Sequence, residues 1–219
     1  MLEKLYEAGA QYGYSKSRRH PSTTNFIFGS RNRFDIINLE KTEEQLKSAI
    51  NFLKSIRSTG KLMVLVGTKP ESRNIIKNIA ERVNAPFVNE RWIGGTLTNF
   101  SEIQRRIAIL NDLEAKKASN DLVFKTKKEK LMLLRKIDNL NVTFGGLRSM
   151  QAVPGVLIVV DPKKESIAVE EARRKNIPVI AIANTDCDIS TLDFPIVMND
   201  ASKKSVEAAL NLLINEVVQ

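Results

Sequence analysis

Cysteine, proline and glycine are scarce in this sequence, and no long apolar run is present. The 219 residues include one cysteine, seven prolines and ten glycines, which argues against a low-complexity chain. The single cysteine, Cys187, excludes an intramolecular disulfide framework and a paired-cysteine zinc motif, and it is typical of a reducing compartment. Because no stretch of about 18 apolar residues occurs, we expect no membrane span. The first residues show no basic region followed by an apolar one, so we expect no secretion signal.

The chain carries enough apolar residues to fold, together with an excess of positive charge. Apolar residues make up 42% of the sequence, which predicts a real core in one sizeable domain. The net charge of +9 is unevenly distributed, because residues 1–100 carry +7, residues 101–138 carry +4 and residues 139–219 carry −2. A clustered cationic excess favours a polyanionic partner, and this clustering assigns the partner to the first two thirds of the chain.

The densest positive charge lies in a basic arm of about residues 10–33. Its central part holds five cations and no acidic residue, and these cations are Lys16, Arg18, Arg19, Arg31 and Arg33. A solvated basic surface is one interpretation of this pattern. We favour contact with phosphate groups, because no acid within the segment neutralises the charges and Ser, Thr and Asn side chains accompany them.

Two hydrophobic periods alternate along most of the chain, which predicts an α/β fold. Short apolar runs indicate buried strands at residues 62–66, 86–88, 156–160, 178–182 and 196–197. Helical spacing indicates helices at residues 42–60, 70–83, 164–175 and 202–218. A capping box at Thr42 predicts the start of the first of these helices, and Pro70 suits the start of the second. This order of elements predicts a parallel sheet with helices on both faces.

Residues 101–141 interrupt the alternation and predict a helical hairpin inserted between the two parts of the α/β domain, residues 1–100 and 142–219. Two apolar seams flank a polar turn at residues 116–121, and they consist of Ile103, Ile107, Leu110 and Leu113, then Leu133, Ile137 and Leu140. Arg105, Arg106 and eight further cations crowd the outer faces. A plain solvated hairpin and a rod that grips RNA along its phosphate backbone both fit this pattern.

No constellation of catalytic residues is evident, so we expect no enzyme activity and no cofactor. Gly67-Thr68-Lys69 follows a strand, where phosphates bind in many enzymes, but neither glycine-rich nucleotide motif is present. A nucleotide-dependent α/β enzyme with its site near Gly67 and Asp161 is therefore the disfavoured alternative. Asp186, Cys187 and Asp188 are potential metal ligands, but three ligands from one short loop make a poor cage. We favour a structural loop there and expect no resident metal.

Residues 89–100 form the most specific string in the chain, Asn-Glu-Arg-Trp-Ile-Gly-Gly-Thr-Leu-Thr-Asn-Phe. We expect a loop after a strand, in which the two glycines allow close backbone approach and Thr98 caps the first hairpin helix. Trp92, the only tryptophan, either fills the joint between sheet and hairpin or stacks on a base. The apolar Ile93 that follows favours the joint.

This string belongs to an ordered series that makes the chain similar to a known family. The series extends over nearly the whole chain and comprises residues 5–9, 28–32, 36–42, 66–69, 89–100, 144–147, 160–165 and 177–181. It includes the Arg-Trp-x-Gly-Gly-Thr-Leu-Thr-Asn core at residues 91–99. On these residues the chain resembles the small-subunit ribosomal protein two (S two) family of bacterial and organellar type.

The resemblance implies a flavodoxin-like parallel sheet of about five strands flanked by helices, with an inserted α-helical coiled-coil hairpin. It implies a non-catalytic structural constituent of the small ribosomal subunit, which supports translation and binds ribosomal RNA through the basic arm and the hairpin. Implied partners are that RNA, neighbouring ribosomal proteins and, in many bacteria, the large mRNA-binding protein S one. We expect neither a membrane partner nor a homo-oligomer, and we expect cytoplasmic ribosomes or those of an organelle as the location. The residues expected to face RNA are Lys16, Arg18, Arg19, Arg31, Arg33, Arg91, Thr96, Asn99, Arg105 and Arg106.

The chain departs from the family pattern near its N-terminus. Gln11 and Tyr14 stand where the family usually has two histidines. A metal or RNA contact that used those imidazoles therefore has no basis in this sequence.

Overall fold

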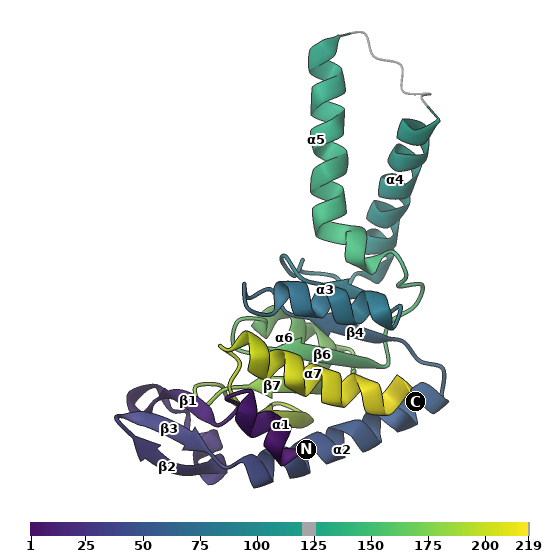
Figure 1. Cartoon of the computed structure of the whole chain (residues 1–219). Coiled ribbons are helices and arrows are strands. Elements are labelled where there is room, and N and C mark those ends of the chain that lie inside the picture. The colour runs from purple at the N-terminus through teal and green to yellow at the C-terminus, as the bar shows by residue number, and fades with distance from the viewer. Residues whose placement is uncertain (120–125, 219) are drawn as a thin grey trace.

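A five-stranded parallel sheet forms the centre of the protein (Figure 1), in a computed structural model that describes residues 1–119 and 126–218. The strands are β4 (Met63–Val66), β5 (Phe87–Val88), β6 (Val156–Val160), β7 (Val179–Ala183) and β8 (Phe194–Val197). Their order across the sheet is β5-β4-β6-β7-β8. Numbered along the chain, these strands run 2-1-3-4-5, which is the flavodoxin-like order. The predicted fold class and the five predicted strand positions are confirmed.

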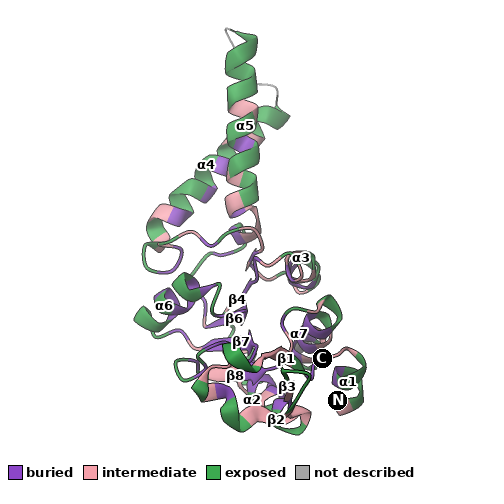
Figure 2. Ribbon diagram, turned by 90° about the vertical axis from the view of Figure 1, so that its left-hand side faces the viewer, coloured by how far each residue is buried: buried purple, intermediate pink, exposed green. Residues whose placement is uncertain are grey.

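Both faces of the sheet are covered, which explains why its strands are continuous apolar runs. On one face, Leu157 and Val159 of β6 share a core with α6 (Ser166–Arg174) and the base of the hairpin. On the other face, Ile158 and its neighbours pack against four helices, which are α1 (Leu2–Glu7), α2 (Leu39–Ser58), α3 (Arg73–Arg82) and α7 (Lys203–Val218). Figure 2 shows buried residues concentrated between these layers. Within the described residues, no helix has the length and apolarity needed to cross a membrane.

Two predicted helix starts are wrong. Helix α2 begins at Leu39 and not at Thr42, because the Asn38 side chain accepts a hydrogen bond from the backbone N–H of Glu40 and caps the helix one turn earlier. Thr42 is buried, and its hydroxyl donates to the carbonyl of Val197 at 2.7 Å. Helix α3 begins at Arg73, since Pro70 lies in the turn that precedes it.

The inserted hairpin consists of α4 (Phe100–Ala118) and α5 (Lys127–Phe144), which project together from one end of the sheet (Figure 1). Ile103, Ile107 and Leu110 of α4 are buried, as is Ile137 of α5, so both predicted seams face inward. Leu113, Leu133 and Leu140 are partly buried against the same core. Helix α4 continues through Lys116 and Lys117, which the sequence assigned to the turn, and residues 120–121 of that turn lie outside the described residues.

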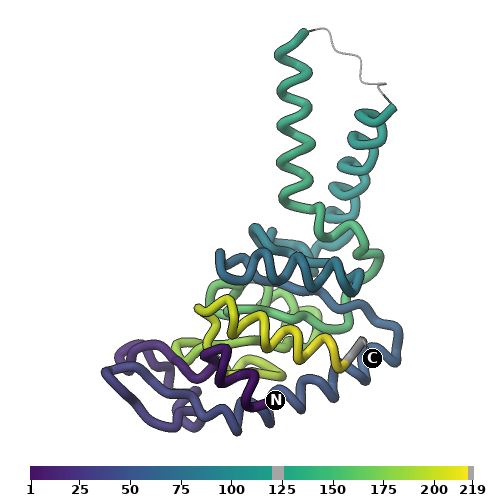
Figure 3. The backbone as a smooth tube through the Cα atoms, in the orientation of Figure 1, coloured from purple at the N-terminus to yellow at the C-terminus, as the bar shows by residue number. Residues whose placement is uncertain are grey.

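Residues 12–37 form a second, three-stranded sheet that the sequence analysis did not predict. Its strands are β1 (Tyr12–Ser15), β2 (Ile27–Arg31) and β3 (Phe34–Ile37), which are antiparallel in the order β1-β3-β2. The β2–β3 turn places Asn32 and Arg33 at positive φ angles of 51° and 68°, the pattern of a two-residue hairpin turn. The basic segment is therefore a folded unit, and Figure 3 shows it at the end of the molecule away from the hairpin.

Candidate nucleic-acid interface

The small sheet is fixed to the main sheet through Thr185, which follows β7. The Thr185 hydroxyl accepts a hydrogen bond from the Tyr14 N–H at 3.0 Å. The Thr185 carbonyl accepts from the His20 N–H at 2.8 Å and from the Thr23 hydroxyl at 2.9 Å. Gly13 permits this approach, because a Cβ atom there would lie 2.7 Å from Cγ2 of Thr185. The cations of the small sheet are thus held in a defined place relative to the main sheet.

Arg19 is engaged inside the small sheet. Its guanidinium makes two hydrogen bonds to Asp35, one of them from Nε at 2.8 Å, and the Ser30 hydroxyl donates to the same carboxylate at 2.9 Å. The Asp35 side chain is fully buried, while that of Arg19 keeps 20% exposure. The Arg19 hydrogen bond lowers the pKa of Asp35, against the opposing effect of burial. The geometry gives Arg19 a structural task in addition to the RNA contact expected from the sequence.

Arg18 also has protein partners, but it remains accessible. Its Nη2 lies 3.0 Å from Oδ2 of Asp186, and its guanidinium stacks 4.2 Å from the centre of the Tyr14 ring. Its side chain is nevertheless 54% exposed. Lys163 approaches the same Asp186 oxygen at 3.0 Å. Asp186 therefore has two cationic partners, Arg18 and Lys163.

Lys16, Arg31 and Arg33 are exposed at the outer end of the small sheet. Arg31 and Arg33 flank Asn32 in the β2–β3 turn, and the carbonyl of Arg33 accepts a hydrogen bond from the N–H of Lys16 at 2.9 Å. In the described part of the chain, none of the three side chains has a carboxylate oxygen within 4.0 Å. They are therefore the cations of this unit with the most charge left for an external anion.

Aromatic side chains accompany these cations, a feature that the sequence analysis missed. Tyr12 is 56% exposed and Phe34 is 53% exposed. Both rings line an open cavity of about 560 Å³ together with Tyr14 and Arg31. The alternation of residues 27–37 was the available signal, because it marks strands with one outward face. Cations interleaved with exposed rings are a composition found where proteins bind single-stranded nucleic acid.

The loop between β5 and α4 separates its expected RNA contacts into two groups. Arg91 and Asn99 are exposed at its two ends. Thr96 is only 1% exposed, and its hydroxyl donates to the carbonyl of Ile93 at 2.6 Å. The structure thus gives the Thr96 side chain an internal partner and leaves it almost no surface.

Trp92 fills the joint between the main sheet and the hairpin, as predicted. It is 6% exposed and shares a core with Ile103 and Ile107 of α4. The expectation that Thr98 caps α4 is wrong, because the N-cap residue is Asn99 and the Thr98 hydroxyl donates to Glu171. The interpretation of Trp92 as a base-stacking residue is not supported by this buried position.

The hairpin presents a largely cationic surface. Arg105 and Arg106 are exposed and share one acid, Glu102, at 3.5 Å and 3.1 Å. Five exposed cations follow on α5 without a carboxylate oxygen within 4.0 Å among the described residues, and these are Lys127, Lys128, Lys130, Arg135 and Lys136. Lys125, another hairpin cation in the sequence, lies outside the described residues. The surplus of positive charge predicted for the hairpin is thus exposed along α5.

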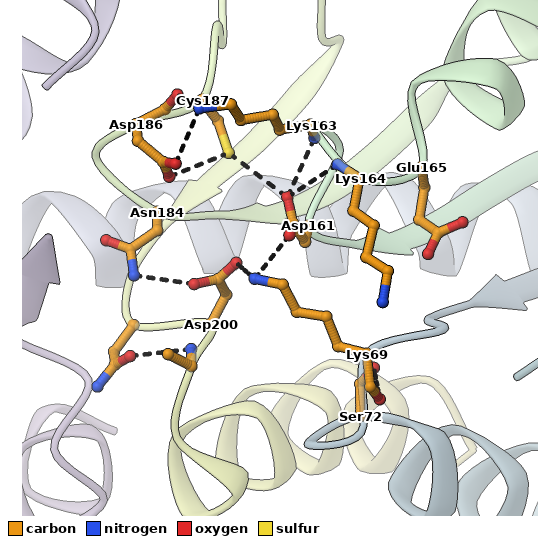
Figure 4. Close-up of polar contacts among 12 residues, drawn as sticks. Lys69, Ser72, Asp161, Lys163, Lys164, Glu165, Asn184, Asp186, Cys187 and Asp200 are labelled. Atoms are coloured by element: carbon orange, nitrogen blue, oxygen red, sulfur yellow. Dashed lines mark hydrogen bonds and ion pairs between the residues drawn. The ribbon is translucent and has the colours of Figure 1, made fainter. Parts of the chain in front are cut away.

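The crevice at the carboxyl ends of the strands is closed by internal ion pairs (Figure 4). In flavodoxin-like folds this crevice, between β4 and β6 here, is where ligands bind. Lys69 Nζ occupies it, 2.6 Å from Asp161 Oδ2 and 2.6 Å from Asp200 Oδ2. Burial alone would lower the pKa of Lys69, but the two carboxylates outweigh it and raise that pKa.

Thr68 is engaged in the same crevice. Its hydroxyl and its N–H both bind the buried Glu165, at 2.5 Å and 3.1 Å. The groups that would cradle a phosphate therefore already hold carboxylates, and these would repel an anion. The geometry counts against the nucleotide-dependent enzyme.

The loop at residues 186–188 has the character of a structural loop. Cys187 is buried, and burial raises the pKa of its thiol to about 12, with nearby Asp161 and Asp186 acting in the same direction. Asp188 accepts from the hydroxyl of Ser190 at 2.6 Å. Across residues 1–119 and 126–218, no group of three potential metal ligands of the His, Cys, Asp or Glu type comes together.

Comparison with known proteins gives one consistent result. The family model described as Ribosomal protein S2 matches residues 5–219. A "Small ribosomal subunit protein uS2" of Helicobacter hepaticus is 43% identical over 94% of this chain and 78% of its own length. Proteins of the same name from Nocardia farcinica and Thermus thermophilus are 41% and 38% identical, over the full length of this chain and 76% and 85% of their own. On the strength of this full-length match, the chain belongs to the ribosomal protein S2 family.

Proposed function

We propose that this protein is a structural constituent of the small ribosomal subunit and binds ribosomal RNA there. Members of the family are structural proteins and not enzymes, and its relatives are named as small-subunit proteins. The observation that carries the proposal is the family match over residues 5–219, since it covers every basic element of the chain. The protein then supports translation as part of a ribosome, in the cytoplasm or in an organelle.

The proposed phosphate contacts are the exposed cations of the small sheet and of the loop before the hairpin that lack an acidic partner. On the small sheet these are Lys16, Arg31 and Arg33, and on the loop before the hairpin Arg91. Each lies at the surface, so binding RNA would break no internal ion pair. Phosphate neutralisation by such side chains supplies most of the salt-dependent affinity in protein–nucleic acid complexes.

The remaining expected contacts take different roles in this proposal. Arg105 and Arg106 act from the hairpin, where Glu102 orients them, while Asn99 offers its amide at the root of α4. Arg18 contributes through its exposed half. Arg19 and Thr96 support the interface mainly by holding the small sheet and the loop in shape.

The hairpin of residues 101–141 acts as a short coiled-coil rod on an α/β body of residues 1–100 and 142–219. The inward seams of α4 and α5 support this division, because they leave the outer cations free to follow a phosphate backbone. Neighbouring ribosomal proteins, S one among them, would dock on surfaces that RNA leaves uncovered. Residues 139–219, with a net charge of −2, are the region best suited to such protein contacts. We expect the free protein to be a monomer and to have no membrane partner.

Co-sedimentation with small subunits from the source cells tests the proposal. We expect the full chain to sediment with the subunit at low salt and to dissociate as salt rises, because counterion release weakens each phosphate contact. A variant with Lys16, Arg31 and Arg33 changed to alanine should dissociate at lower salt. The matched control changes Lys175, Lys203 and Lys204, which are exposed elsewhere on the body and, among the described residues, likewise have no carboxylate oxygen within 4.0 Å. Sedimentation of the wild-type protein wholly free of small subunits at low salt would overturn the proposal.

A further inference from the structure

One carboxylate holds the loop from which the hairpin rises. Glu171 lies on α6 and accepts five hydrogen bonds from the loop between β5 and α4. Oε1 accepts from the N–H of Gly95 at 2.7 Å and from Nε1 of Trp92 at 3.2 Å. Oε2 accepts from the N–H groups of Leu97 and Thr98, at 2.9 Å and 3.1 Å, and from the Thr98 hydroxyl at 3.2 Å.

The charge of Glu171 is balanced by these donors alone. The residue is 5% exposed, and no Lys or Arg nitrogen of the described chain lies within 4.0 Å of its carboxylate. Burial raises the pKa of Glu171, but the N–H groups of Leu97, Gly95 and Thr98 together outweigh burial, so its pKa is lowered. The five donors of the loop therefore stabilise the ionised form of Glu171.

The loop that Glu171 holds connects two of the proposed RNA contacts. Arg91 precedes Trp92 directly, and Asn99 is the N-cap residue of α4. Gly95 has a positive φ of 95°, so the chain turns sharply between these two residues. The direction in which α4 leaves the loop sets the position of Arg105 and Arg106 on its second turn.

Helix α6 provides a firm support for this arrangement. Its residues Ala168, Val169 and Ala172 belong to the core that covers one face of the main sheet. Glu171 is therefore anchored to the body, while all its donors belong to the root of the hairpin. Separations of 73 to 79 residues along the chain divide the two sides of this contact.

We infer that Glu171 is a positioning residue for RNA binding, which fixes the hairpin root so that Arg91, Arg105 and Arg106 reach the RNA together. This inference rests on the proposed function. Glu171 is buried and acts only through the loop. Its negative charge has the same sign as that of RNA, so direct contact would weaken binding. A positioning role would strengthen binding.

Glu171→Gln tests the inference, with Glu170→Gln as the matched control. The amide keeps the size of the carboxylate but turns an NH₂ group toward backbone N–H donors. Glu170 is the preceding residue on α6, is exposed, and pairs only with Arg174 at 3.6 Å among the described residues. Removal of one charge-assisted hydrogen bond raises the equilibrium constant for local opening of the loop about tenfold. We therefore expect amide exchange at Gly95, Leu97 and Thr98 to accelerate at least about tenfold in Glu171→Gln and to stay unchanged in the control.

Two further measurements separate positioning from simple loss of stability. Fluorescence of Trp92, the only tryptophan, should change in Glu171→Gln, while amide exchange in β6 and β7 stays as in the wild type. Affinity for small-subunit RNA should fall about threefold or more, with the log–log salt slope reduced, because correctly placed cations each neutralise a phosphate. If Glu171→Gln does not fold, Thr98→Ala is a smaller perturbation, because it removes the hydroxyl donor alone. It should accelerate amide exchange at Gly95, Leu97 and residue 98 in the same direction.

A double-mutant cycle tests whether Glu171 is coupled to Arg105 and Arg106 in RNA binding. If Glu171 positions the hairpin, the affinity lost on changing Arg105 and Arg106 to alanine should be smaller in the Glu171→Gln background than in the wild type. Equal losses in both backgrounds, or wild-type affinity of Glu171→Gln, would overturn the inference while leaving RNA binding intact. Failure of the wild-type protein itself to bind the RNA would instead overturn the proposed function.

Discussion

Arg19→Ala should destabilise the protein by about 3–5 kcal/mol, the usual cost of removing one partner from a buried ion pair. Asp35 is the reason, because its side chain is fully buried and Arg19 supplies two of its hydrogen bonds. After the change only the Ser30 hydroxyl at 2.9 Å remains among the contacts of this carboxylate that the structure shows. Arg33→Ala, at an exposed cation of the same unit, should change stability by less than about 0.5 kcal/mol.

Chemical denaturation of the two variants measures this difference in the free energy of unfolding directly. In thermal unfolding of a chain of this size, the Arg19→Ala loss corresponds to a fall in Tm of about 10 °C. The pKa of Asp35 is lowered in the folded state, so its contribution is present above the unfolded value of about 3.9 and is lost as the pH falls through the folded value. The gap between wild type and Arg19→Ala should therefore narrow as the pH falls below about 4.

RNA binding by the same variants tests whether Arg19 acts through the fold or contacts a phosphate. Arg33→Ala should lower the log–log salt slope by about 0.7 to 0.9, the contribution of one phosphate contact. Arg19→Ala should leave that slope unchanged wherever the variant is folded. If Arg19→Ala were as stable as the wild type and lost one unit of slope, Arg19 would be a phosphate contact and the assignment from geometry would be refuted.

Three further outcomes follow from individual contacts. Gly13→Ala should destabilise the protein by about 1–3 kcal/mol in thermal unfolding, since its Cβ would lie 2.7 Å from a Thr185 carbon, whereas Gly29→Ala has no atom within 4 Å and should be tolerated. Lys69→Met should cost several kcal/mol in denaturant titrations at neutral pH by leaving buried carboxylates unpaired, and Asp200→Asn in the same chain should recover part of that loss; an equally stable Lys69→Met would contradict the closed crevice. Cys187 should resist thiol reagents at pH 8 in the folded protein and react on unfolding, because it is buried with a pKa of about 12.

The main sheet was predictable from the sequence because its burial is symmetrical. Strands covered on both faces must be apolar throughout, so runs such as residues 156–160 stand out against amphipathic helices. The helix starts were harder to predict. At Asn38 and Thr42 two capping residues lie one turn apart, and the competing contact of Thr42 with Val197 is visible only once the chain has folded.

The small sheet was missed for a local reason and a tertiary one. Its β2–β3 turn uses Asn32 and Arg33, where the recognisable sequence signal would be an asparagine followed by glycine. Strand β1 has no clear alternation of burial, and its pairing with β3 is irregular. The register is instead supported by contacts with Thr185, more than 160 residues away along the chain.

The candidate interface was predictable in composition but not in the task of each residue. A count of charges finds the cations of the small sheet and of the hairpin, yet it treats Arg19 and Arg33 alike. Only the structure shows that one is paired with a buried acid and the other is exposed in a turn. Glu171 was missed altogether, because an acidic residue on a charged helix carries no signal of the loop that it contacts.

The placement of charge explains how a ligand-binding fold serves as a structural protein. In this order of strands the β4–β6 crevice is the natural site for a small anion, and helix starts and backbone N–H groups favour such a ligand there. Here Lys69 faces inward to two carboxylates, and Glu165 takes the hydrogen bonds of Thr68. Exposed cations that lack an ion-pair partner within the described chain lie, among other places, on the small sheet and on the hairpin, at different ends of the body (Figure 1). A long polyanion can contact both ends at once, whereas a mononucleotide cannot, so this distribution of charge favours the RNA partner proposed above over a small anion.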